Sequence, residues 1–132
     1  MVILDSSVFI DQFRADGHRE RIDSIDEPIR TSAVVLAELW RGASAQAEKA
    51  LLGALERRYP VLAPTEKNWL ESGQILARMH NDYGFEPRKL RELHFDVLIA
   101  LTARTHGVRL ITSNRADFEL IREYRAFKLE VW

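Results

Sequence analysis

Four carboxylate side chains stand where acids are unusual in a folded protein. Two follow apolar runs typical of strands and two lie on strongly apolar segments typical of helices: Asp5, Glu38, Asp96 and Asp117. In an open α/β sheet, ligands bind outside the carboxyl ends of the strands, so these acids are expected to meet there. Gathered carboxylates repel one another unless a cation lies among them, and Mg²⁺ prefers oxygen ligands. The pattern therefore predicts a site for a hard divalent cation.

Each of these acids also has an ordinary structural explanation. Asp5 can cap the helix that follows it, and Asp96 can stabilise a helix N-terminus. Asp117 can be a first-turn acid of the last helix, while Glu38 can be a solvent-facing charge. Taken singly the two interpretations are close to balanced, and for Asp5 the cap is slightly favoured. The comparable placement of all four acids favours a shared site.

Strands and helices alternate along the chain. Strands are expected at residues 2–5, 28–31, 108–112 and 127–131, with a weaker one at 61–62. Helices are expected over residues 7–13, 18–25, 33–41, 44–58, 66–81, 96–104 and 113–122. The basic residues 88–91 are expected to connect two helices, and Asp96 to begin the most apolar helix.

This alternation predicts an α/β fold, a three-layer sandwich whose central, mostly parallel sheet of four or five short strands is flanked by helices. With 132 residues and no linker or repeat, the chain is expected to form a single domain over residues 1–132. Hydrophobic residues at 46% and charged residues at 30% fit a globular protein, and the N-terminus has no signal-peptide pattern. We therefore expect a cytoplasmic protein with no membrane association.

Several other chemistries find no support in the sequence. The chain has no cysteine, which excludes disulfides and thiolate chemistry. Its six glycines are isolated, so no phosphate-binding loop is present, and neither serine after Asp5 lies in a nucleophile motif. The net charge of −1 argues against nonspecific coating of nucleic acid. Two alternatives remain open: a different metal-dependent phosphate-processing enzyme, and a binding module without catalysis.

Four blocks of sequence resemble one known family, the PIN-domain endoribonucleases, and within it the VapC-type toxins of bacterial type II toxin–antitoxin systems. In chain order these blocks are VILDSSVFID at the N-terminus, TSAVVLAELWRG, FDVLIALTA and LITSNRADF. The resemblance spans the whole chain. The basic run before Asp96 departs from the weakly polar stretch that many relatives have there, which bears on substrate selection and leaves the metal site unaffected.

The resemblance implies an activity and a role for each matching residue. The protein is expected to be a Mg²⁺- or Mn²⁺-dependent endoribonuclease with one or two ions, leaving 5′-phosphate and 3′-hydroxyl ends. Asp5, Glu38, Asp96 and Asp117 would be the metal-binding and catalytic acids. The polar residues that orient them would be Ser6, Ser7, Thr112 and Asn114.

The expected partners are RNA, a small antitoxin protein and a second copy of the chain. Basic residues near the expected site that could pair with RNA phosphates are Arg115, the strongest single candidate, and Arg14, Arg41, Arg88, Lys89 and Arg91. By the same resemblance, such toxins form homodimers and are neutralised by an antitoxin segment that covers the active-site groove. Of the apolar residues near the N-terminus, Phe9 and Leu39 are assigned to the core, while Phe13 and Trp40 are candidates for a partner surface.

Overall fold

Five short strands form one fully parallel sheet in the computed structural model, which describes residues 1–132. The spatial order is β3-β2-β1-β4-β5, so the first strand lies at the centre. The strands are β1 (Val2–Leu4), β2 (Ile29–Ser32), β3 (Val61–Leu62), β4 (Arg109–Thr112) and β5 (Lys128–Val131). The sequence predicted a mostly parallel sheet of this size, and every pair of neighbouring strands is parallel.

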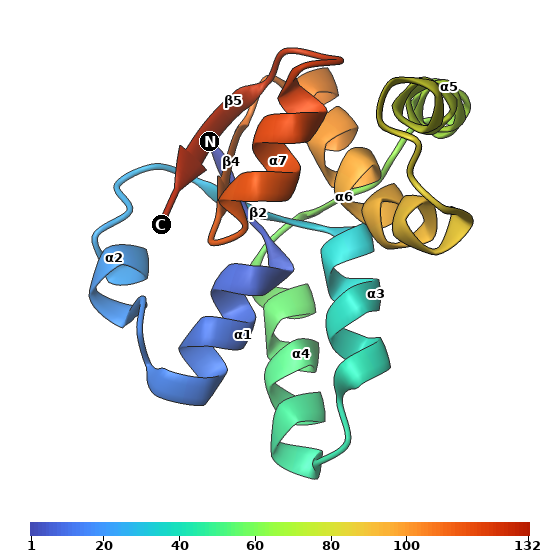
Figure 1. Ribbon diagram of the computed structural model, residues 1–132. Helices are drawn as coiled ribbons and strands as arrows, with labels where there is room; N and C mark the ends of the chain where they lie inside the picture. Colours follow the sequence, from blue (N-terminus) through green and yellow to red (C-terminus); the bar gives the residue numbers. More distant parts are fainter.

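Seven helices flank the sheet and complete the α/β sandwich (Figure 1). They are α1 (Ser6–Ala15), α2 (Arg19–Asp23), α3 (Ala33–Gly42), α4 (Gln46–Arg58), α5 (Glu66–Tyr83), α6 (Pro87–His106) and α7 (Arg115–Arg122). Figure 1 shows α1, α3 and α4 grouped in the lower part of the view and α5, α6 and α7 in the upper part, where β4 and β5 lie beside α7. No helix combines the length and the apolarity that a membrane crossing requires.

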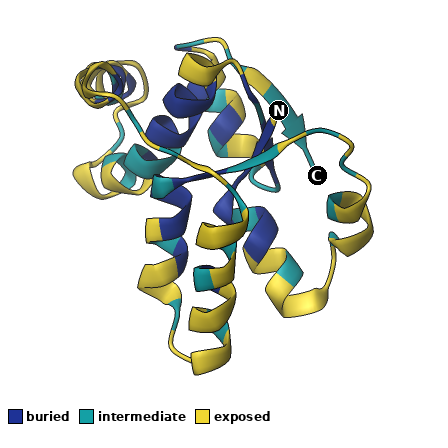
Figure 2. Cartoon of the chain, turned by 180° about the vertical axis from the view of Figure 1, so that it is seen from behind, coloured by how far each residue is buried: buried dark blue, intermediate teal, exposed yellow.

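The core is built on β1, β4 and α6. All three residues of β1 are buried, and so is every residue of α6 from Val97 to Ala103 (Figure 2). Because α6 is apolar around its whole circumference at this point, it can pack against the sheet and against α5 and α7 together. The expectation of a central buried helix after Asp96 is confirmed.

The start of α6 differs from the sequence prediction. The helix begins at Pro87, with Glu86 at the N-cap position, and includes the basic residues that were expected to form a connection. Proline is well suited to the first helical position because its missing N–H group has no intrahelical acceptor there. Asp96 therefore lies in the middle of α6, and the explanation of this carboxylate as a helix cap is wrong.

Candidate metal centre

The topology brings three of the four predicted acids together at the carboxyl edge of the sheet. Asp5 directly follows β1, while Glu38 comes from α3 and Asp96 from α6. One carboxylate oxygen from each of the three lies within 4.8 Å of the others. The central position of β1 places Asp5 between the neighbouring strands β2 and β4, whose connections carry α3 and α7.

Asp5 occupies the N-cap position of α1, but its side chain makes no capping hydrogen bond. Its Oδ2 atom instead accepts hydrogen bonds from the Ser7 hydroxyl at 2.7 Å and the Thr112 hydroxyl at 2.8 Å. The residue is only 2% exposed, so these bonds fix the direction of a buried carboxylate. The Asp5 side chain therefore does not cap α1, and its carboxylate lies in the acid cluster.

Polar side chains also orient Glu38 and Asp117. The Ser6 hydroxyl donates to Glu38 Oε1 at 3.2 Å, which links α1 to α3. The Asn114 side-chain amide donates to Asp117 Oδ2 at 3.1 Å, and the Asn114 backbone N–H donates to Thr112 Oγ1 at 2.9 Å. All four polar residues named from the sequence therefore contact an acid of this group.

Asp117 adjoins the cluster without belonging to its closest group. It lies in the first turn of α7, and its Oδ1 atom is 3.4 Å from Lys89 Nζ on α6. Its carboxylate is close enough to contribute to raising the pKa of Asp96. The Lys89–Asp117 ion pair could not be anticipated from the sequence, because the two residues are far apart in the chain.

The electrostatics of the cluster correspond to a cation site. Burial, followed by repulsion from Asp5, Glu38 and Asp117, raises the pKa of Asp96 to about 8. Burial together with the charge of Asp5 raises the pKa of Glu38 to about 6. A cation among the carboxylates would oppose both shifts, because a nearby positive charge favours the ionised form of each acid. The donors are all carboxylate oxygens, which suits Mg²⁺ or Mn²⁺ better than a softer metal.

The candidate RNA-binding residues lie in different surroundings. Arg88 and Arg91 line a small cleft beside Glu38, and Lys89 is paired with Asp117. Arg115 is the first residue of α7, and its side chain is 67% exposed. Its Nη1 atom is 3.1 Å from Oε1 of Glu119 on the same helix. The role of each in RNA binding stays a prediction.

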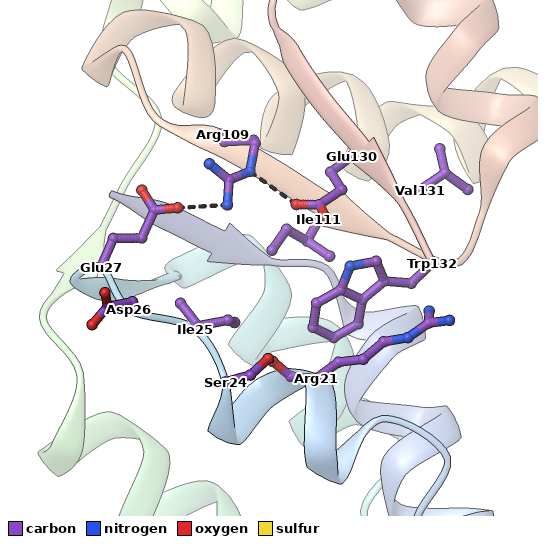
Figure 3. Close-up of a pocket in the computed structure, with 10 residues that line it drawn as sticks. All are labelled: Arg21, Ser24, Ile25, Asp26, Glu27, Arg109, Ile111, Glu130, Val131 and Trp132. Carbon is purple, nitrogen blue, oxygen red and sulfur yellow. Dashed lines mark hydrogen bonds and ion pairs between the residues drawn. The ribbon is translucent and has the colours of Figure 1, made fainter.

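A separate cavity of about 510 Å³ lies between α2 and the strands β4 and β5 (Figure 3). None of the three clustered acids lines it. Its Arg109 side chain is neutralised on both sides, by Glu27 at 2.5 Å and by Glu130 at 2.9 Å, while Arg21 lies over the ring of Trp132. Both arginines of this cavity therefore have partners within it.

A parallel sheet with a carboxylate cluster at its carboxyl edge defines a class of α/β proteins with an acidic site that could hold a cation. Within that class, the PIN domain family model matches residues 2–124. The chain belongs to the PIN-domain family. A comparison with curated protein sequences finds no match.

Solved structures of toxin–antitoxin proteins share the fold. VapBC2 from Rickettsia felis, bound to a DNA fragment from its promoter, superposes with a TM-score of 0.72 at 20% identity, covering 100% of this chain and 99% of that chain. VapBC-1 from nontypeable Haemophilus influenzae superposes with a TM-score of 0.71 at 22% identity, covering 100% of this chain and 98% of that chain. VapC20 from Mycobacterium tuberculosis, a sarcin-ricin loop cleaving toxin, superposes with a TM-score of 0.70 at 17% identity, covering 91% of this chain and 95% of that chain.

Proposed function

We propose that this PIN domain is a Mg²⁺- or Mn²⁺-dependent endoribonuclease that acts as the toxin of a toxin–antitoxin pair. The observation that carries the proposal is the group of three carboxylates from β1, α3 and α6, with ligand atoms within 4.8 Å of one another. Membership of the PIN family and the likeness to VapC folds support the same activity.

In this proposal, Asp5 and Asp96 are the principal cation ligands, and Glu38 and Asp117 complete the site. A bound divalent cation would neutralise charge on the phosphodiester and assist the attack of water. Ser7 and Thr112 keep Asp5 aimed at the site, so little reorganisation is needed when substrate binds. Lys89, held beside Asp117, places a positive charge where a phosphate oxygen can approach.

The test is cleavage of single-stranded RNA by purified protein with Mg²⁺, Mn²⁺ or EDTA. Asp5→Asn keeps the shape of the side chain and removes its charge, so we expect at least a hundredfold loss of cleavage, about 3 kcal/mol in transition-state stabilisation. Asp23→Asn is the matched control, because Asp23 is an exposed acid at the end of α2. Full activity of the Asp5 variant would refute the site.

Calorimetric titration with Mn²⁺ separates the alternatives. Binding to the wild type that is lost in Asp5→Asn supports the metal centre. Absence of divalent-ion binding, together with absence of cleavage, would favour a binding module without catalysis. Hydrolysis of small phosphate esters without cleavage of RNA would favour a different phosphate-processing enzyme.

We further propose that the neutralising antitoxin occupies an apolar groove next to the acids. This groove, of about 410 Å³, lies between α1, α3 and α4, and Phe13, Leu39 and Glu38 are among its lining residues. Phe13 is 42% exposed, whereas Phe9 and Leu39 are buried, as the sequence indicated. An antitoxin segment placed there would reach Glu38 and cover the site. Loss of antitoxin binding in Phe13→Ser, measured by pull-down of the co-expressed pair, would support this position.

The proposed assembly is a homodimer working in the cytoplasm, where RNA and a newly made antitoxin are both present. Light scattering of the purified protein at micromolar concentration tests the dimer directly. A monomeric mass at that concentration would refute it.

A further inference from the structure

A second cleft opens on the other side of Glu38, between α3 and α6. Its volume is about 250 Å³, and its lining is dominated by guanidinium groups: Arg41, Arg88 and Arg91, together with Glu38, Glu92 and Phe95. The cleft shares Glu38 with the acid cluster, and Phe95 is the neighbour of Asp96 in α6. A nucleic-acid chain that extends from the acid cluster toward α6 would therefore lie against these three arginines.

The arginines come to one place because of helical spacing. Glu38 and Arg41 are three residues apart on α3, and Arg91 and Phe95 are four residues apart on α6, so each pair shares a helix face. The Arg41 guanidinium carbon lies 5.4 Å from the centroid of the Phe95 ring. Contact with the ring favours a defined position for the charge between the two helices.

The guanidinium groups of two of these arginines form no direct polar contact within the protein. Neither Arg41 nor Arg91 forms an ion pair or a side-chain hydrogen bond, although the charge of Arg41 is near enough to Glu38 to lower the pKa of that carboxyl group. Arg88 has only an exposed contact of 3.4 Å with Glu92. Arg109, in the cavity of Figure 3, has two carboxylates and is satisfied internally. The guanidinium groups of Arg41 and Arg91 therefore keep their donors available for an external anion.

We propose that this cleft binds a backbone phosphate of single-stranded RNA next to the phosphodiester held at the acid cluster. The inference rests on the proposed nuclease function and adds the direction that the RNA takes. A polyanion is repelled by a cluster of carboxylates, so it needs compensating cations close to the site. The groove between α1, α3 and α4 also contains Glu38, but Arg14 is its one basic residue and five of its nine lining residues are hydrophobic. It therefore suits a protein segment better than a phosphate backbone.

The test is binding of a short fluorescent single-stranded RNA to the Asp5→Asn protein, measured by anisotropy over a series of salt concentrations. Arg41→Ala and Arg91→Ala are each expected to weaken binding about three- to tenfold and to reduce the slope of log K against log salt by about 0.7, the value for one lost phosphate contact on a single strand. Arg122→Ala is the charge-matched control, because Arg122 is exposed on α7 and does not line the cleft. Thermal unfolding confirms that each variant is folded. If Arg41→Ala unfolds because it loses the contact with Phe95, the result for Arg91→Ala alone decides whether the cleft binds phosphate.

The outcomes separate this inference from the proposed function. A reduced slope in both cleft variants, with Arg122→Ala unchanged, supports the cleft as a phosphate site even if the wild-type protein cleaves no RNA. Wild-type cleavage with unchanged affinity and slope in both variants would overturn the inference and leave the nuclease proposal intact. Loss of antitoxin binding with unchanged RNA binding would also overturn it, because the cleft would then belong to the protein partner.

Discussion

The acid cluster makes a specific prediction for Asp96→Asn, a substitution that removes one charge and keeps the shape of the side chain. In the metal-free protein the pKa of Asp96 is raised from 3.8 to about 8, chiefly by burial. A carboxyl group with a raised pKa makes the native state bind more protons than the unfolded chain. The free energy of unfolding of the wild type therefore falls as the pH rises from about 4 to about 8. The Asp96→Asn variant lacks the part of this fall in unfolding free energy that the ionisation of Asp96 causes.

The size of the effect follows from the pKa shift. Each pKa unit corresponds to about 1.4 kcal/mol, so a shift of about four units sets an upper limit of about 6 kcal/mol. Because repulsion is shared with Asp5, Glu38 and Asp117, removing one charge relieves only part of it, and ionisation of the others is then easier. We expect Asp96→Asn to be about as stable as the wild type at pH 4 and about 2 kcal/mol more stable at pH 8, both in EDTA.

The assay is urea unfolding followed by circular dichroism at pH 4 to 8, with and without Mg²⁺. With Mg²⁺ at pH 8 the order should reverse, because a cation that binds only the native state stabilises the wild type and binds the variant weakly. Asp23→Asn is the control and should follow the wild type throughout. A variant whose stability differs from the wild type by the same amount at every pH would refute the reasoning that the cluster is electrostatically strained.

Other substitutions test the surroundings of the cluster. Thr112→Val removes the buried donor to Asp5, and we expect a loss of about 1–2 kcal/mol in unfolding free energy by urea titration, together with weaker Mn²⁺ binding by calorimetry. Lys89→Met should lower RNA cleavage severalfold through kcat/KM while leaving the melting temperature almost unchanged, because the Lys89–Asp117 pair is partly exposed. Gly107→Ala, at a φ of +64° after α6, should cost about 1 kcal/mol by urea unfolding without changing cleavage per folded molecule; an effect on kcat alone would contradict the assignment of Gly107 to helix termination.

Sequence periodicity was sufficient to predict the sheet and most of the helices. Ser32 and Thr65 cap α3 and α5, and Gly107 follows α6 in a left-handed conformation, so local capping residues mark these helix ends. The prediction failed at the start of α6. There residues 88–91 were expected to form a connection, although the proline that precedes them is well suited to the first position of a helix.

The four acids were chosen from sequence because each stands beside or within an apolar stretch, where an unpaired charge is costly. That argument identified which carboxylates are unusual, and the family resemblance gave them expected roles. It could not determine how close they lie, because proximity depends on the pairing of β1 with β2 and β4 and on the packing of α3 against α6. The packing of α6 against α3 creates the Arg41–Phe95 contact, and its packing against α7 creates the Lys89–Asp117 pair. Both contacts join residues far apart in the chain.

The sequence by itself therefore determined the types of residues at the site and the local elements that carry them, because strand ends, caps and apolar faces are short-range properties. The tertiary structure decided the charges that these residues bear and the surfaces that surround them. Burial and repulsion among Asp5, Glu38 and Asp96 arise only when three separate elements meet, and so does the division between an apolar groove and a basic cleft on the two sides of Glu38.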